Sequence, residues 1–228
     1  MLLLNGCSFA DRWVPSQNFL QSIDCSKTMN ISILGGSFQR TLRTSIEYCA
    51  SFGNPKMAII PITLASRWEL ALGKEDVIID GTWYSMQHPE YIDFDKLDKS
   101  ISKDKVKQLI ENYYGVIPNV RSTWDKMFTE IIALASFFES QNIKYLFFDM
   151  CNNFDHKHLA GYKGFEKLDL INNNKNIINL FEFCGNKFMY DTLSPVEQNK
   201  IDPYMHHHHA TEYLALEKYL IDYLNRKL

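Results

Sequence analysis

The sequence predicts an α/β domain in which a central, mostly parallel sheet is covered by helices on both faces. The expected architecture is a three-layer α/β/α sandwich with long loop insertions. Short apolar runs of strand length alternate with longer segments whose apolar residues recur every three to four positions. That alternation is typical of βαβ units and of parallel strands. With 228 residues, 46% of them hydrophobic, the chain suits one domain that spans residues 1–228.

In the first half of the chain, strands are expected at 2–4, 29–34 and 56–63, and helices at 16–24 and 38–52. The first strand is an apolar run that stops at the turn-forming pair Asn5-Gly6. The second ends at Gly35-Gly36, which permits close backbone approach. Ser37 then caps the longer helix, whose expected buried face contains Leu42, Ile46 and Cys49.

The second half predicts two amphipathic helices, one more strand and a terminal helix. The helices are marked by apolar residues from Val106 to Tyr114 and from Trp124 to Phe138. The strand is expected at 143–149, a short strand or helix at 177–183, and the terminal helix at about 208–228. Residues 70–100, 151–176 and 184–205 show no periodicity, so long loops are expected there.

Composition narrows the class of protein. A net charge of −3 without a basic stripe argues against a nucleic-acid partner. The five cysteines are scattered and form no C-x-x-C pair, which argues against a disulfide framework or a zinc knuckle. No stretch approaches the roughly 18 apolar residues of a membrane helix, and the first residues do not resemble a signal peptide. We therefore expect a cytoplasmic protein without a membrane partner, cofactor or bound metal, and its oligomeric state stays open.

Ser8 is the first candidate for chemistry. It lies in the turn that follows the first strand, and in open α/β sheets ligands bind at the carboxyl ends of the strands. A serine there is a candidate nucleophile. The alternative is a buried serine that satisfies a local turn.

The histidine run His206–His209 is the second candidate, and it precedes the terminal helix. One interpretation is a metal site, although no carboxylate or cysteine stands at helical ligand spacing. The other is a general base, because a histidine accepts a hydroxyl proton well near neutral pH. Asp202, four residues before His206, is close enough to orient that base.

Together these segments resemble the SGNH/GDSL hydrolase superfamily across the whole chain, through four short blocks. The blocks are Gly6-Cys7-Ser8-Phe9, Gly35-Gly36-Ser37, the end of the third strand, and Asp202 to His206. Two further stretches, Arg43-Thr44-Ser45-Ile46-Glu47-Tyr48 and Thr63-x-x-x-Arg67-x-Glu69, are similar to a branch found in phage and marine bacterial genomes. The resemblance implies a flavodoxin-like sheet and an esterase in which Ser8 attacks, His206 is the base and Asp202 orients it. It also implies that the backbone N–H groups of Ser8 and Gly35 form the oxyanion hole.

The sequence departs from the family's pattern in two places. The family's third block supplies an Asn side chain to the oxyanion hole, but here the third strand ends at Thr63, and Thr63 or Arg67 would have to substitute. The last block has one extra residue between Asp202 and His206.

The expected substrate is an O-acyl ester of a small molecule or carbohydrate. Trp68 would line the acyl or sugar site, and Arg67 would bind a substrate carboxylate or pair with Glu69. The alternatives are a non-catalytic carbohydrate-binding protein on the same scaffold and a metal-dependent enzyme that uses His206–His209.

Overall fold

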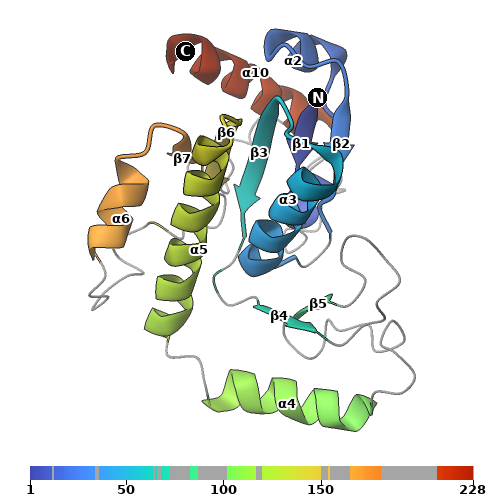
Figure 1. The fold of residues 1–228 in the computed structure, drawn as a ribbon, viewed down its shortest axis with the longest axis vertical. Helices are drawn as coiled ribbons and strands as arrows, with labels where there is room; N and C mark the ends of the chain where they lie inside the picture. Colours follow the sequence, from blue (N-terminus) through green and yellow to red (C-terminus); the bar gives the residue numbers. More distant parts are fainter. Residues whose placement is uncertain are drawn as a thin grey trace, which may run out of the picture.

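Five parallel strands form the central sheet of the computed structural model, in the order β2-β1-β3-β6-β7 (Figure 1). The structure describes residues 1–11, 13–33, 36–63, 65, 68–71, 83–86, 102–116, 120–149, 154, 165–180 and 210–227. The strands are β1 (Leu2–Leu4), β2 (Thr28–Asn30), β3 (Met57–Ile62), β6 (Lys144–Asp149) and β7 (Ile177–Asn179). Counted along the chain, this order is 2-1-3-4-5, the doubly wound arrangement of flavodoxin-like folds. The predicted fold class is confirmed.

The described helices are α1 (Ser8–Asp11), α2 (Gln17–Ser22), α3 (Phe38–Phe52), α4 (Lys103–Val116), α5 (Val120–Ser140), α6 (Phe165–Asn172) and α10 (Ala210–Lys227). Side chains of α3, α5 and α6 pack against one face of the sheet, and those of α2 and α10 pack against the other. The sheet is therefore the middle of three layers, as the sequence predicts.

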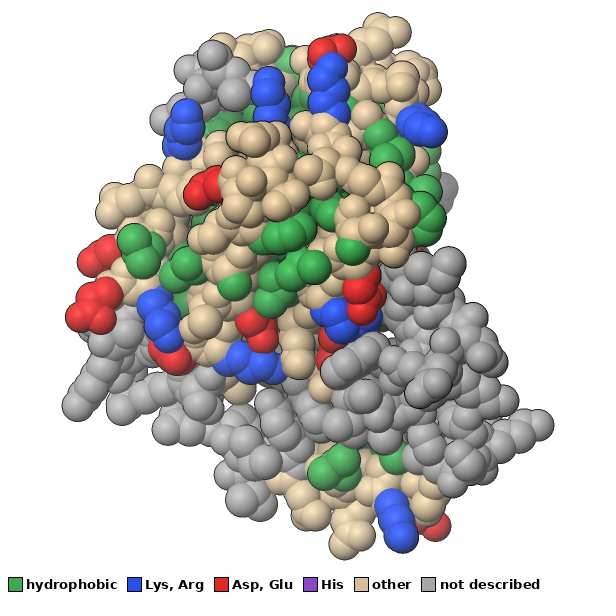
Figure 2. Space-filling view, in the orientation of Figure 1, with side chains coloured by type: hydrophobic (Ala, Val, Ile, Leu, Met, Phe, Trp, Pro, Cys, Tyr) green, Lys and Arg blue, Asp and Glu red, His purple; other side chains and the backbone are tan. Residues whose placement is uncertain are grey.

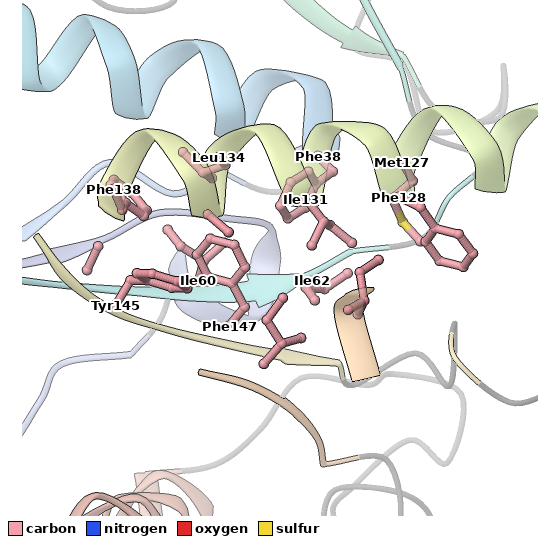
Figure 3. Packing of buried hydrophobic residues seen from close by; sticks show 14 of the residues in the cluster. Phe38, Ile60, Ile62, Met127, Phe128, Ile131, Leu134, Phe138, Tyr145 and Phe147 are labelled. Carbon is pink, nitrogen blue, oxygen red and sulfur yellow. The ribbon is translucent and has the colours of Figure 1, made fainter. Parts of the chain in front are cut away.

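Alternate residues of β1, β3, β6 and β7 enter opposite layers. In β3, Ile60 and Ile62 face α5, whereas Ile59 faces α10. Figure 3 shows the first of these layers, in which Phe138 and Ile131 of α5 point toward the sheet. Such burial on both faces explains why the strands read as continuous apolar runs in the sequence.

A second, two-stranded sheet was not expected. Strands β4 (Trp68–Ala71) and β5 (Trp83–Met86) pair antiparallel within a stretch predicted to be a turn and a loop. Figure 1 shows this hairpin beyond the carboxyl end of β3, between the main sheet and α4. The segment lacks clear alternation because its strands are short, so the prediction of an irregular segment was wrong at these positions.

Three other expectations need correction. Helix α6 lies inside the predicted loop 151–176, and of its described side chains it buries Leu168 and Ile171; at eight residues it is too short to show a clear period. Strand β2 ends at Asn30 rather than at residue 34. The Asn30 side chain accepts a hydrogen bond from the N–H of Ser32 at 3.0 Å, which turns the chain out of the sheet.

The buried face of α3 differs in part from the predicted one, although Cys49 is buried and Leu42 packs against the core as expected. Ile46 is 39% exposed, whereas Thr41, Thr44 and Ser45 are fully buried. The helix itself begins and ends as expected, with Ser37 as its N-cap. This polar face of α3 therefore has a hydrogen-bonding role, and it contacts the turn that precedes Ser8.

Candidate active site at the carboxyl edge of the sheet

Ser8 stands where the strand order of the sheet reverses. It is the first residue of α1, which follows β1 after only three residues. The carbonyl oxygen of Cys7 accepts hydrogen bonds from the N–H groups of Ala10 (3.0 Å) and Asp11 (3.1 Å), so the chain turns into a helix at once. The crevice at such a reversal is the usual ligand site of doubly wound sheets. The turn expected at Ser8 is therefore present, and it leads directly into the short helix α1.

The loops after β1 and β2 meet backbone to backbone beside Ser8. The N–H of Ile33 donates to the carbonyl oxygen of Gly6 at 3.3 Å. A Cβ atom on Gly36 would lie 2.8 Å from the same oxygen, closer than real Cβ contacts come. Gly6 has a φ of +148° and rests against Pro61 of β3, where a Cβ would lie 3.1 Å from the Pro61 carbonyl oxygen. Glycine is needed at both positions for this approach.

The side chain of Asn5 holds the turn between β1 and α1 in place. Its Nδ2 donates to the Thr44 hydroxyl at 2.8 Å, to the Ser45 hydroxyl at 2.9 Å and to the carbonyl of Thr41 at 3.1 Å. Its Oδ1 accepts from the N–H of Gly6 at 2.9 Å. Asn5 is completely buried, so these bonds replace the water that the amide has lost. The polar face of α3 thus supplies the acceptors for the Asn5 amide group.

Arg40 joins the same network. Its side chain is 1% exposed, and it donates through one terminal nitrogen to Asn5 Oδ1 at 3.1 Å. The other terminal nitrogen donates to the carbonyl of Ile31 at 2.7 Å. Because Asn5 belongs to the loop after β1 and Ile31 to the loop after β2, one guanidinium contacts both loops.

The predicted site residues are only partly described by the structure. The backbone of Ser8 is placed at the carboxyl edge, and Thr63 follows β3 at the same edge with an exposed fraction of 1%. Trp68 begins β4, and its side chain lies outside the described residues. The predicted positions Gly35, Arg67, Asp202 and His206–His209 also lie outside them.

A cluster of charged side chains attaches the β4–β5 hairpin to α3 and α5. Arg43 of α3 donates from Nε and from a terminal nitrogen to the two carboxylate oxygens of Glu69 in β4, at 3.1 and 2.7 Å. Arg43 also pairs with Glu47 at 2.7 Å. In Figure 2, charged side chains of both signs gather along the lower border of the described face. The Glu69 carboxylate thus binds Arg43, while its expected pairing with Arg67, which lies outside the described residues, stays a prediction.

Glu130 of α5 lies in the same cluster. Burial raises the pKa of its carboxyl group to about 7, although Lys126 opposes this shift, and Glu69 adds to it through like-charge repulsion. Lys126 lies 3.7 Å from Glu130 and also donates to Gln39 at 2.7 Å. The charge state of this cluster therefore changes near neutral pH.

A buried carboxylate links the N-terminal segment to the last helix. Glu217 of α10 accepts hydrogen bonds from Trp13 Nε1 at 3.0 Å, from the N–H of Ser16 at 2.8 Å and from the Ser16 hydroxyl at 2.5 Å. Trp13 also stacks on Tyr213, with ring centroids 6.1 Å apart. Helix α10 is thus fixed against the segment that follows α1, and its first residue, Ala210, comes four positions after His206.

Sequence reasoning missed Asn5, Arg40 and Glu217 as parts of this region. The sequence does mark this region by polar residues at positions where apolar ones are expected. They are the Thr and Ser residues of α3 and a glutamate among the apolar positions of α10. It also missed Ser32, whose hydroxyl is buried in the loop after β2 and has no hydrogen-bond partner in the described structure.

The described residues offer neither a metal site nor a membrane-spanning helix. They contain no group of three or more His, Cys, Asp or Glu side chains arranged to hold a metal ion. The helices they form include none with the length and apolar character needed to cross a membrane. Cys7, Cys25 and Cys49, which are described, are free thiols.

No family model and no curated protein matches the chain. Among solved structures, it is similar to a "putative acylhydrolase" from Bacteroides fragilis, with 10% identity and a TM-score of 0.48 over 99% of this chain and 86% of that one. It is also similar to the psychrotrophic esterase EstA from Pseudoalteromonas sp., a structure inhibited by monoethylphosphonate, with 13% identity and a TM-score of 0.42 over 96% and 97% of the two chains. Both likenesses are distant in sequence and in structure.

Proposed function

We propose that the protein is a serine hydrolase of the SGNH type that cleaves an ester. The observation that carries this proposal is the position of Ser8, which starts α1 at the carboxyl end of β1, where the strand order reverses. The glycine-lined contact between the loops after β1 and β2 lies directly beside it. A nucleophile of an α/β hydrolase is expected at this place in the fold, where backbone N–H groups can serve as oxyanion donors.

In this proposal Ser8 Oγ attacks the ester carbonyl carbon and His206 takes the hydroxyl proton. Asp202 holds the imidazole of His206 in the orientation and tautomer that accept this proton. His206 then returns the proton to the leaving alcohol, and an acyl group remains on Ser8. Water, deprotonated by His206, releases the acid in the second half of the reaction.

The negative charge on the carbonyl oxygen requires donors aimed at it. We assign this role to the N–H groups of Ser8 and Gly35. The first residues of a helix have N–H groups without intrahelical partners, which suits Ser8. The Thr63 hydroxyl, at the end of β3, would take the place of the Asn that the resemblance leads one to expect, and Arg67 is the other candidate.

We propose an O-acyl group on a small molecule or carbohydrate as the substrate. Trp68 starts the hairpin that lies beyond the carboxyl edge of the sheet, and it would line the acyl or sugar site with Arg67 (Figure 1). A carbohydrate-binding protein without turnover is the second candidate, because Thr63 instead of Asn follows β3.

Labelling with a fluorophosphonate tests the reaction directly. Wild-type protein is expected to gain one phosphonyl group, and peptide mass spectrometry should place it on Ser8. Ser8→Ala should abolish labelling and the hydrolysis of aryl esters. Cys7→Ala is the matched control, because it removes the adjacent nucleophile and should leave the label on Ser8.

The outcome separates the two candidate functions. A folded wild-type protein without any adduct on Ser8, and with carbohydrate binding that Ser8→Ala does not change, would replace the hydrolase by the binding protein. An adduct on Ser8 that depends on His206, shown by its loss in His206→Ala but not in His208→Ala, would support the assigned base.

A further inference from the structure

Arg40 is buried at a place where a cation is costly. It lies in the first turn of α3, where the helix dipole disfavours positive charge, and its exposed fraction is 1%. Burial of a guanidinium costs free energy unless its N–H groups find well-placed acceptors. An apolar side chain at this position would favour stability more, so the hydrogen bonds that Arg40 makes indicate a role other than stability.

That geometry joins the two loops beside Ser8. One terminal nitrogen of Arg40 binds Asn5 Oδ1 at 3.1 Å, and the other binds the carbonyl of Ile31 at 2.7 Å. Asn5 in turn binds the N–H of Gly6, two residues before Ser8. Ile31 lies in the loop that leads to Gly35. A planar guanidinium holds its two acceptors at a fixed separation, which a flexible ammonium cannot do.

The backbones of the two loops touch so closely that one loop cannot move without displacing the other. Gly6 accepts the N–H of Ile33, and Gly36 packs so close to Gly6 that a Cβ would lie 2.8 Å from the Gly6 carbonyl oxygen. Any change in the bridge from Arg40 is therefore passed directly to the residues that flank Ser8 and Gly35.

We propose that Arg40 is a positioning residue that sets the distance between the two backbone donors of the oxyanion hole. This inference rests on the proposed hydrolase function and deepens it. Arg40 does not touch the substrate. It acts by fixing the loop after β1, which carries Ser8, against the loop after β2, which leads to Gly36.

Arg40→Lys is the principal test. It keeps the positive charge and loses the rigid fork. Because a misplacement of about 1 Å in a catalytic group costs up to about 10²-fold in rate, kcat for an aryl ester is expected to fall about 10- to 100-fold. KM should change little, and the pH at half-maximal kcat should stay the same, since the base is untouched. The rate of fluorophosphonate labelling should fall in parallel.

Two further variants make the test independent of folding effects. Leu134→Ala, in the core between α5 and the sheet, is expected to lower the melting temperature while leaving kcat unchanged. Gly36→Ala should push the loops apart without removing any hydrogen bond from Arg40, and it should reproduce the fall in kcat. If Arg40→Lys does not fold, Arg40→Gln, which also lacks the rigid fork, takes its place, and Gly36→Ala tests whether kcat depends on the separation of the two loops.

Failure of this inference differs from failure of the proposed function. A wild-type protein that does not label on Ser8 contradicts the hydrolase itself. A wild-type protein that labels, together with Arg40→Lys or Gly36→Ala variants that are folded and keep the wild-type kcat, overturns the role of Arg40 and leaves the hydrolase intact.

Discussion

At the scale of single residues, Asn5 shows how a polar side chain organises this edge of the sheet. It contacts three acceptors on α3 and receives hydrogen bonds from Gly6 and Arg40, all in a fully buried position. The sequence indicates a turn at Asn5-Gly6. It does not indicate that the amide is held by residues about 40 positions later, because such contacts depend on the tertiary fold.

Asn5→Ala is expected to lower the free energy of unfolding by about 2–4 kcal/mol, because buried donors and acceptors on α3 would lose their partner. Urea-induced unfolding followed by circular dichroism measures the change. Asn54→Ala is the matched control, since Asn54 is exposed and bonds only Gln141 in the described structure. That substitution should stay within about 0.5 kcal/mol of wild type. Equal effects of the two substitutions would show that the Asn5 network does not stabilise the fold.

Glu217 makes a comparable prediction at the other end of the chain. Glu217→Ala would leave the donors of Trp13 and Ser16 buried without an acceptor, at a cost of about 2–4 kcal/mol of unfolding free energy. Glu217→Gln should cost less, because its amide oxygen still accepts hydrogen bonds. Asp222→Asn, an exposed position on the same helix, is the control in the same urea titration. A Glu217→Ala variant as stable as wild type would contradict this account.

At the scale of elements, the hairpin β4–β5 depends on charged residues for its attachment to α3 and α5. The side-chain oxygen of Gln39 accepts hydrogen bonds from the N–H of Glu69 and from the Lys126 ammonium group. The Glu69 carboxylate binds Arg43. Glu130, one turn from Lys126, completes the cluster. This attachment is the basis for a pH-dependent stability.

The free energy of unfolding is expected to fall as the pH rises from about 4.5 to about 8 because of Glu130. Its carboxyl has a pKa of about 7 in the folded protein and 4.5 as the ordinary value, so the folded state favours the protonated form. The stabilisation is complete below the lower value and is lost as the pH passes the upper one. A shift of this size corresponds to about 3 kcal/mol.

Glu130→Gln should remove this dependence. The variant is expected to match wild type near pH 4.5 and to exceed its stability at pH 8, measured by urea unfolding at each pH. Glu111→Gln on α4, where Glu111 is 54% exposed, is the control and should keep the wild-type pH profile. A Glu130→Gln variant that follows the wild-type profile would assign the pH dependence to other groups.

The elements that the sequence predicted well are those with strong apolar patterns. The residues Tyr213, Leu216, Leu220 and Leu224, which define the terminal helix in the sequence, are all buried in α10. The buried face of α3 was predicted only in part, because its fully buried Thr41, Thr44 and Ser45 are polar and a pattern of apolar residues does not reveal them. The hairpin and α6 were missed because each is too short to show a clear period.

The candidate site was predictable to a smaller extent. The position of Ser8 followed from a strand and a turn that are adjacent in the sequence. The roles of His206 and Asp202 stay predictions, since these residues lie outside the described part of the chain. Arg40 could not be inferred, because its importance comes from two loops that only the folded sheet brings together.

At the scale of the whole molecule, stability requires helices on both faces of the sheet. Leu220 of α10 is completely buried against β1, β3 and β6 side chains in the layer that also holds Trp13 and Phe19. Leu220→Ala is expected to lower the free energy of unfolding by about 2–4 kcal/mol, through lost burial and the cavity left behind. Leu170→Ala, which removes a side chain that is 62% exposed, is the control. Thermal melts of both variants test the difference, and an equal loss would place α10 outside the core.

The packing of α10 against the N-terminal segment has a consequence for biosynthesis. Ribosomes make β1, Trp13 and Phe19 well before residues 210–227, yet these groups form a single apolar layer. Until α10 leaves the exit tunnel, this face of the growing sheet lacks one of its two covering helices, so Leu2 and Leu4 are less protected from water and from other chains. Helices α3 and α5 can protect only the opposite face. The nascent chain is therefore expected to need a chaperone until α10 has emerged, because incomplete α/β sheets with exposed apolar surface aggregate readily.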